Sequence, residues 1–165
     1  MILEGVRPYN KSENTMATEN VNGVLGDLIE INNDRIAGFE KVIEDINDEN
    51  VDLKAIFEEY AQQSRKNVQE LSAIAGTAPH LEEDKSVSGT LHRVWIDIKS
   101  VFGGSDRASI LSEAERGEDA IKKAYQDALS DTGLPAQAQE IVRSQAQGIN
   151  AAHDSIKVLR DTAKA

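Results

Sequence analysis

The amino-acid sequence predicts an all-α protein, an antiparallel up-down four-helix bundle with an extra short helix between the second and third long helices. Three observations support this fold class. Apolar residues recur three and four positions apart in four long segments, which is the spacing of one helix face. Aromatic residues make up only 4% of the chain, whereas strong helix formers are common. Turn residues separate the long segments from one another.

The first two long helices are expected at about residues 18–46 and 51–75. Residues 47–50 form a polar turn that also offers an N-cap to the second helix. Gly76 follows the last apolar turn, where a glycine commonly ends a helix in the left-handed conformation. These two helices therefore form the first half of the predicted bundle.

A shorter helix is expected at residues 87–102, after an acidic connection that contains Pro79. Its apolar face includes Leu91, Trp95 and Ile98. We expect this face to pack against the bundle, because apolar helix faces are usually part of a core. A contact with another subunit or another protein is the alternative.

The third long helix is expected to begin at Ser105–Asp106, a good N-cap, and to end at Thr132–Gly133. The fourth opens at Pro135, because proline suits the first turn of a helix. Residues 16–165 are thus interpreted as a single domain. Residues 1–15 precede Met16, a more natural start, and are expected to be a disordered N-terminal extension.

Composition excludes several classes of function. The chain has no cysteine, so disulfides, thiolate metal sites and cysteine nucleophiles are ruled out. The net charge of -11 argues against nucleic acid or an anionic membrane as a partner, since both require a basic face. No run approaches the roughly 20 apolar residues of a membrane span, and no secretory signal is evident. A cytoplasmic location is therefore expected.

Polar side chains interrupt the apolar face near the middle of every long helix. If the helices alternate in direction, these side chains meet at one level of the bundle. We interpret them mainly as a buried ionic network around Arg35 and Glu118, which would penalise slippage between helices. The expected members of this polar layer are Asn32, Arg35, Ser64, Asn67, Glu118 and Gln145.

A metal site at the same level is the alternative. Di-metal carboxylate bundles take one Glu from each of two helices and a Glu-x-x-His unit from each of the other two. Here the candidate ligands are Glu115, Glu118 and His153, enough for a single ion of iron, manganese or zinc. The set is incomplete, and a buried Arg35 would place positive charge where the ion would lie. These two points favour the network.

Motifs of catalysis are absent from the sequence. It contains no phosphate-binding glycine loop, no nucleophile elbow and no His-Glu-x-x-His unit. We therefore expect no enzymatic activity.

Five segments carry a family resemblance, in the order LIEINNDRIAGFEKV, LKAIFEEYAQQS, LHRVWIDIKS, ERGEDAIKKAYQDAL and AHDSIKVLRD. With them the chain, from about residue 20 to 162, resembles a bacterial family of four-helix-bundle proteins of unknown function grouped with the ferritin-like superfamily. The resemblance implies a ferritin-like bundle in a cytoplasmic bacterial protein. It carries the ferritin ligand pattern only to Glu118 or Glu115 and to His153.

The leading functional prediction is a non-enzymatic structural, stress-related or interaction protein, with a second copy of itself or an unknown protein as partner. The stress-related part depends on superfamily analogy alone. The runner-up is a metal-binding protein with a degenerate ferritin-like site at mid-bundle.

Overall fold

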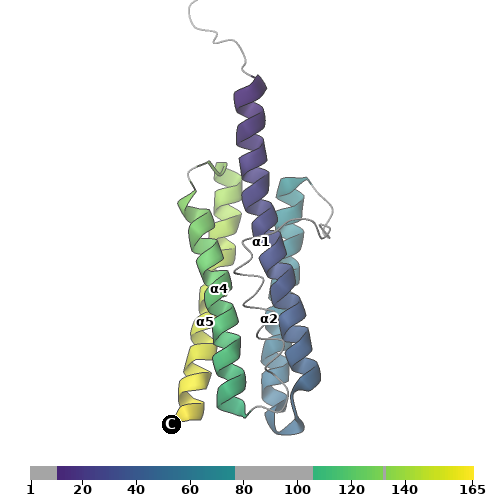
Figure 1. The fold of residues 1–165 in the computed structure, drawn as a ribbon, viewed down its shortest axis with the longest axis vertical. Coiled ribbons are helices and arrows are strands. Elements are labelled where there is room, and N and C mark those ends of the chain that lie inside the picture. The colour runs from purple at the N-terminus through teal and green to yellow at the C-terminus, as the bar shows by residue number, and fades with distance from the viewer. Residues whose placement is uncertain (1–10, 77–105, 132) are drawn as a thin grey trace, which may run out of the picture.

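The computed structural model describes residues 11–76, 106–131 and 133–165, with side chains from residue 21 onward. These ranges form α1 (Lys11–Asp45), η1 (Asp48–Asn50), α2 (Val51–Ala75), α4 (Arg107–Ser130) and α5 (Ala136–Lys164). The four long helices lie side by side as a bundle (Figure 1), and no strand occurs among the described residues. The all-α bundle is confirmed.

The helix ends follow local signals in the sequence. Gly76 ends α2 with a φ of 69°, and its N–H donates to the carbonyls at the end of that helix. A residue with a side chain would be strained in this conformation, which explains the glycine. Asp106 caps α4, since its carboxylate accepts a hydrogen bond of 2.8 Å from the Ser109 N–H. The predicted stop and the predicted cap are both confirmed.

Two local predictions were wrong. α1 begins at Lys11 and not at residue 18, so residues 11–15 of the predicted extension are helical. No glycine or proline lies between residues 11 and 18 to halt a helix that is already nucleated. At the turn, Asn50 makes no side-chain cap to α2; its amide donates to the Asn47 side chain and its oxygen accepts from Arg107.

The predicted helix at residues 87–102, with Leu91, Trp95 and Ile98, lies outside the described residues.

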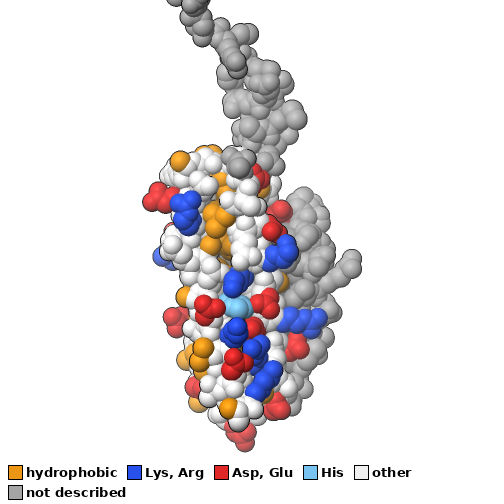
Figure 2. Space-filling view, turned by 90° about the vertical axis from the view of Figure 1, so that its left-hand side faces the viewer, with side chains coloured by type: hydrophobic (Ala, Val, Ile, Leu, Met, Phe, Trp, Pro, Cys, Tyr) orange, Lys and Arg blue, Asp and Glu red, His pale blue; other side chains and the backbone are white. Residues whose placement is uncertain are grey.

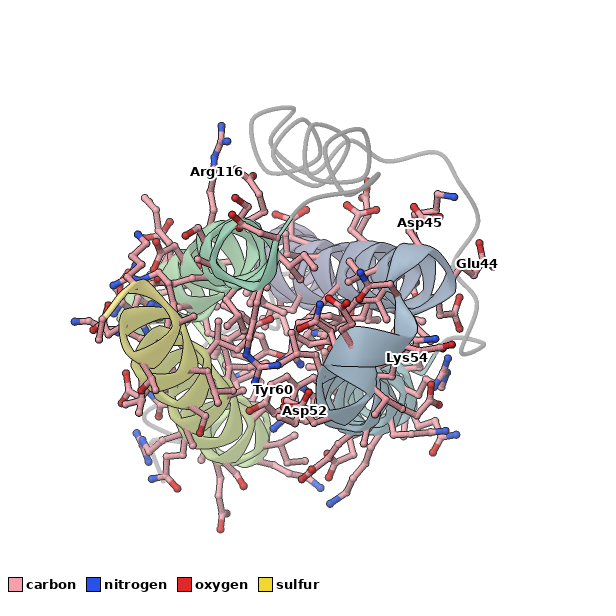
Figure 3. All side chains as sticks on the ribbon, turned by 90° about the horizontal axis from the view of Figure 1, so that it is seen from below. Glu44, Asp45, Asp52, Lys54, Tyr60 and Arg116 are labelled. Atoms are coloured by element: carbon pink, nitrogen blue, oxygen red, sulfur yellow. The ribbon has the colours of Figure 1, made fainter. Side chains whose placement is uncertain are left out.

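The core lies between all four helices. α1 packs most closely with α2, and α4 with α5, while α1–α4 and α2–α5 contacts join the two pairs. Viewed along the bundle, the charged side chains of Glu44, Asp45 and Arg116 point outward, whereas Tyr60 lies between the helices (Figure 3). None of the helices in the described ranges combines the length and apolar character needed to cross a membrane. The buried apolar side chains include Leu28, Ile31, Phe39, Leu53, Phe57, Leu71, Leu111, Ile121, Val142, Ile149 and Ile156.

An exposed ion pair joins the first turns of α2 and α4. Arg107 donates to both carboxylate oxygens of Asp52, at 2.9 and 2.7 Å. The hydrogen bond from Arg107 lowers the pKa of Asp52 below its ordinary value of 3.8. Because folding lowers this pKa, the pair stabilises the folded state at a pH above 3.8 and loses that effect as the pH falls through the lowered value.

We therefore expect Asp52→Asn to lower the free energy of unfolding at neutral pH by only about 0.2–1 kcal/mol, since both side chains are solvent-exposed. Urea unfolding of the wild type and the variant measures this difference. It should shrink toward zero well below pH 3.8, where the wild-type carboxylate is also neutral. A difference that stays constant with pH would show that the charge of Asp52 is not responsible.

Candidate functional site

Arg35 of α1 and Glu118 of α4 form an ion pair in the centre of the bundle. Both side chains are completely buried. The Arg35 Nε donates to Oε1 of Glu118 at 2.6 Å, and Nη2 donates to Oε2 at 2.8 Å. This bidentate arrangement is the strongest geometry available to these two groups. Each residue lies in the apolar face of its helix, which is why the bundle brings them together.

The other terminal nitrogen of Arg35 donates to α2. Its Nη1 donates to the backbone oxygen of Tyr60 at 3.2 Å, to Oε1 of Gln63 at 2.8 Å and to Oγ of Ser64 at 2.9 Å. The rings of Phe39 and Tyr60 lie 5.3 and 5.5 Å from the guanidinium carbon, within the range of cation–π attraction. The buried charge is therefore both paired and hydrogen-bonded, the condition under which its burial is tolerated.

A second buried network takes one side chain from each helix. Asn32 of α1 donates to the hydroxyl of Tyr125 at 2.8 Å, and that hydroxyl donates to Oε1 of Gln145 on α5 at 2.7 Å. Asn67 of α2 donates to Asn32 at 3.2 Å, and Gln145 donates to the backbone oxygen of Asn67 at 3.3 Å. Burial raises the pKa of Tyr125 well above 10, so its hydroxyl remains a donor at neutral pH.

All six residues predicted for the polar layer are buried and belong to these two networks. Sequence reasoning missed Tyr125 and Gln63 as members. Tyr125 carried a usable signal, because a tyrosine on a buried helix face needs a partner for its hydroxyl. Gln63 carried none, since it lies beside the apolar face and reaches Arg35 only through the packing of α2 against α1.

The predicted ligand His153 lies elsewhere, between α4 and α5. Its side chain is 9% exposed, its Nε2 is 2.6 Å from Oδ1 of Asp119, and its Nδ1 is 3.1 Å from Oδ1 of Asp154. Oε1 of Glu115 is 3.8 Å from the same Nε2. Figure 2 shows this face, where the pale blue histidine side chain lies between acidic side chains. The hydrogen bond with His153 lowers the pKa of Asp154.

The three predicted ligands are not brought together. Glu115, Asp119 and His153 form a group whose ligand atoms lie within 4.8 Å of one another, and Glu118 is not part of it. Both oxygens of Glu118 are instead bonded to Arg35. Asp119 was the residue missed. It lies four positions after Glu115 on the same helix face, a spacing that the sequence did show.

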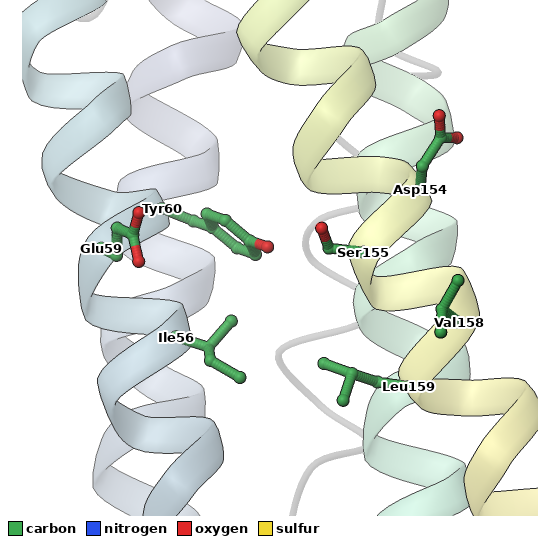
Figure 4. Close-up of a pocket in the computed structure, with 7 residues that line it drawn as sticks. All are labelled: Ile56, Glu59, Tyr60, Asp154, Ser155, Val158 and Leu159. Carbon is green, nitrogen blue, oxygen red and sulfur yellow. The ribbon is translucent and has the colours of Figure 1, made fainter.

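A shallow pocket of about 530 Å³ opens between α2 and α5. Ile56, Val158 and Leu159 form its apolar part, and Val158 is 64% exposed. The hydroxyl groups of Tyr60 and Ser155 face each other across it, and Glu59 and Asp154 border it (Figure 4). The pocket therefore combines an apolar floor with an acidic border.

Comparison with known proteins identifies one family. The model of a domain of unknown function (DUF2383) matches residues 20–131, which include α2 and α4 and most of α1. A search of curated proteins finds no match.

Proposed function

This chain belongs to the DUF2383 family, a domain of unknown function, and on that premise we propose that it is a non-enzymatic, ferritin-like helical bundle that binds a protein partner. In this proposal the Arg35–Glu118 pair takes the place of a metal centre and holds the helices in one register. The single observation that carries this register role is the bidentate contact between the two fully buried side chains. A cytoplasmic bacterial setting and a stress-related role come from the resemblance and are part of the proposal.

The contacts support an antiparallel up-down arrangement within this proposal. The most closely packed pairs, α1–α2 and α4–α5, are joined by the short connections at residues 46–50 and 131–135. Short connections in helical bundles join antiparallel neighbours. Arg35 then lies at the same level as Glu118, where di-metal bundles hold their carboxylates. Because the guanidinium occupies both oxygens of Glu118, a cation at this position would have to displace it against charge repulsion.

The register role is tested by exchanging the ion pair for apolar residues of similar size, Arg35→Met with Glu118→Leu. We expect the double variant to remain folded and helical, because such replacements are often neutral or stabilising. It should, however, lose the single packing arrangement, since nothing polar then penalises a shifted helix. An amide NMR spectrum would show more than one set of signals. A single sharp set, as in the wild type, would contradict the register role.

The α2–α5 pocket is the surface we assign to the partner. Its acidic border and the net charge of -11 favour a protein segment that carries basic and apolar side chains together. A second copy of this chain is disfavoured, because two acidic borders would face each other.

Site-specific cross-linking tests this surface in cell extract. A photoreactive residue at Val158, in the pocket, should cross-link to a basic segment of one partner. The matched control is Val51, which is 63% exposed at the start of α2 and does not line the pocket. Equal cross-linking from both positions, or none from Val158, would overturn the assignment. Cross-linking of Val158 to a second copy of the chain would make the protein a homo-oligomer instead.

A further inference from the structure

The group formed by Glu115, Asp119 and His153 is used by neither the buried networks nor the α2–α5 pocket. We propose that it binds one divalent transition-metal ion of the zinc class, on the surface where α4 meets α5. It offers one imidazole nitrogen and two carboxylate oxygens. This is a donor set that zinc, manganese and iron accept. The inference goes beyond the proposed function and does not depend on it.

Binding of a zinc ion would require only small movements of the ligand side chains. Bonds of about 2.0–2.1 Å to a tetrahedral zinc ion place ligand atoms roughly 3.3 Å apart. Here Nε2 of His153 is 2.6 Å from Asp119 and 3.8 Å from Glu115, so one separation widens and the other narrows. The Asp119 side chain contacts His153 but is otherwise 62% exposed and not held by packing, whereas the side chains of Glu115 and His153 are only 9% exposed.

Two of the three ligands, His153 and Glu115, are also held in orientation by neighbouring side chains. A histidine that binds a metal usually donates its second ring N–H to a carboxylate or carbonyl oxygen, which fixes the tautomer. Asp154 lies 3.1 Å from Nδ1 of His153, which leaves Nε2 directed at the other two ligands. Glu115 is oriented in a similar way, because Arg160 bonds its Oε2 while its Oε1 faces His153. Each of these two ligands therefore presents one atom to the ion.

Charge distinguishes this site from the centre of the bundle. At the centre, Arg35 holds both oxygens of Glu118 and leaves none for a cation. At the surface site, the carboxylates of Glu115 and Asp119 would face the 2+ charge of the ion. Arg160 bonds only one oxygen of Glu115, and its own positive charge is also paired with Asp161 at 2.8 Å. Three protein ligands leave further coordination positions for water, as in metal sites that exchange small ligands.

Titration of the chelator-treated full chain with zinc, followed by calorimetry, tests the site. We expect one ion per chain, with a dissociation constant raised about tenfold or more by Asp119→Asn and by His153→Gln. Asp127→Asn is the matched control, since Asp127 is an equally exposed acid on α4 paired with Lys123. A chain with His80→Ala and His92→Ala controls for the other two histidines. Zinc should also shift the ¹⁵N signal of Nε2 in His153.

The exposed position of Asp119 keeps the test decisive even if His153→Gln fails to fold. The proposal is overturned if no stoichiometric zinc binding occurs, or if the Asp119→Asn variant binds zinc as tightly as the Asp127→Asn variant. It is also overturned if the chain with His80→Ala and His92→Ala no longer binds zinc. Manganese and magnesium titrations, run in parallel, define selectivity. Magnesium bound as tightly as zinc, and equally in both aspartate variants, would indicate only surface charge and would also contradict the site.

Discussion

Replacing Glu118 by Gln is expected to lower the free energy of unfolding by about 3–5 kcal/mol. The substitution keeps the shape of the side chain but removes the charge opposite Arg35, which is completely buried. An uncompensated charge in the interior is far more costly than a missing contact. Since domains of this size are stable by only about 5–15 kcal/mol, the variant should be near its folding limit. Urea unfolding followed by circular dichroism measures the loss.

Two control variants test whether the loss of stability in Glu118→Gln comes from the unpaired charge of Arg35. Glu113→Gln changes the same chemical group on the same helix, where the carboxylate faces Arg116 near the surface, and should shift stability by less than about 0.5 kcal/mol. The Arg35→Met with Glu118→Leu variant should be more stable than either single variant, because no charge is left unpaired. If the double variant instead shows the sum of two large losses, the two side chains do not act as a pair.

Tyr125→Phe is expected to lower the free energy of unfolding by about 1–3 kcal/mol. The hydroxyl is both an acceptor for Asn32 and a donor to Gln145, and all three side chains are buried. Without it, one amide N–H and one amide oxygen lose a partner in the interior, and each then carries a desolvation penalty. Urea unfolding is again the measurement. Tyr60→Phe is the matched control, since Tyr60 is only half-buried at the pocket, and it should lose less.

The hydroxyl of Tyr125 should also affect how the free energy of unfolding depends on pH at alkaline pH. Burial raises the pKa of Tyr125 above its ordinary value of 10, so the unfolded chain releases this proton at a lower pH than the folded one. The folded state then binds more protons, and stability must fall as the pH rises above 10. Tyr125→Phe should reduce that pH dependence. An unchanged dependence would show that the phenol of Tyr125 does not control alkaline unfolding.

Much of the fold could be predicted from local signals. The apolar spacing located α2 to the residue, and it placed Leu25, Leu28 and Phe39 in the core. Gly76 and Asp106 marked helix ends because a left-handed stop and an N-cap depend only on neighbouring backbone. The start of α1 was missed, because Met16 was taken as the natural start of the chain, whereas nothing in residues 11–18 blocks helix propagation. The direction in which Asn50 turns depended on Arg107, which is distant in the chain.

The candidate sites were predictable only in part. Six polar residues on buried helix faces could be named in advance, because a polar residue in an apolar stripe is visible in the sequence. The pairing of Arg35 with Glu118 could also be predicted from their opposite charges. The other hydrogen-bond partners could not be named, since they depend on the level and rotation of helices that are far apart in sequence. The ligand group shows the same limit. Glu115, Glu118 and Asp119 all lie on α4 within about one turn, and a small rotation decides which of them meets His153.

By itself, the sequence determined the helical class, the absence of cysteine chemistry, and the presence of charge in the interior. These properties follow from composition and from a period of 3.6 residues, which no tertiary contact alters. Only the tertiary structure decided that Glu118 belongs to Arg35 and not to the group around His153, and that Asp119 belongs to that group. The physical reason is that a carboxylate on a helix face has no intrinsic partner. Its partner is set by the rotation and level of the neighbouring helix, and the packing of the whole bundle fixes both.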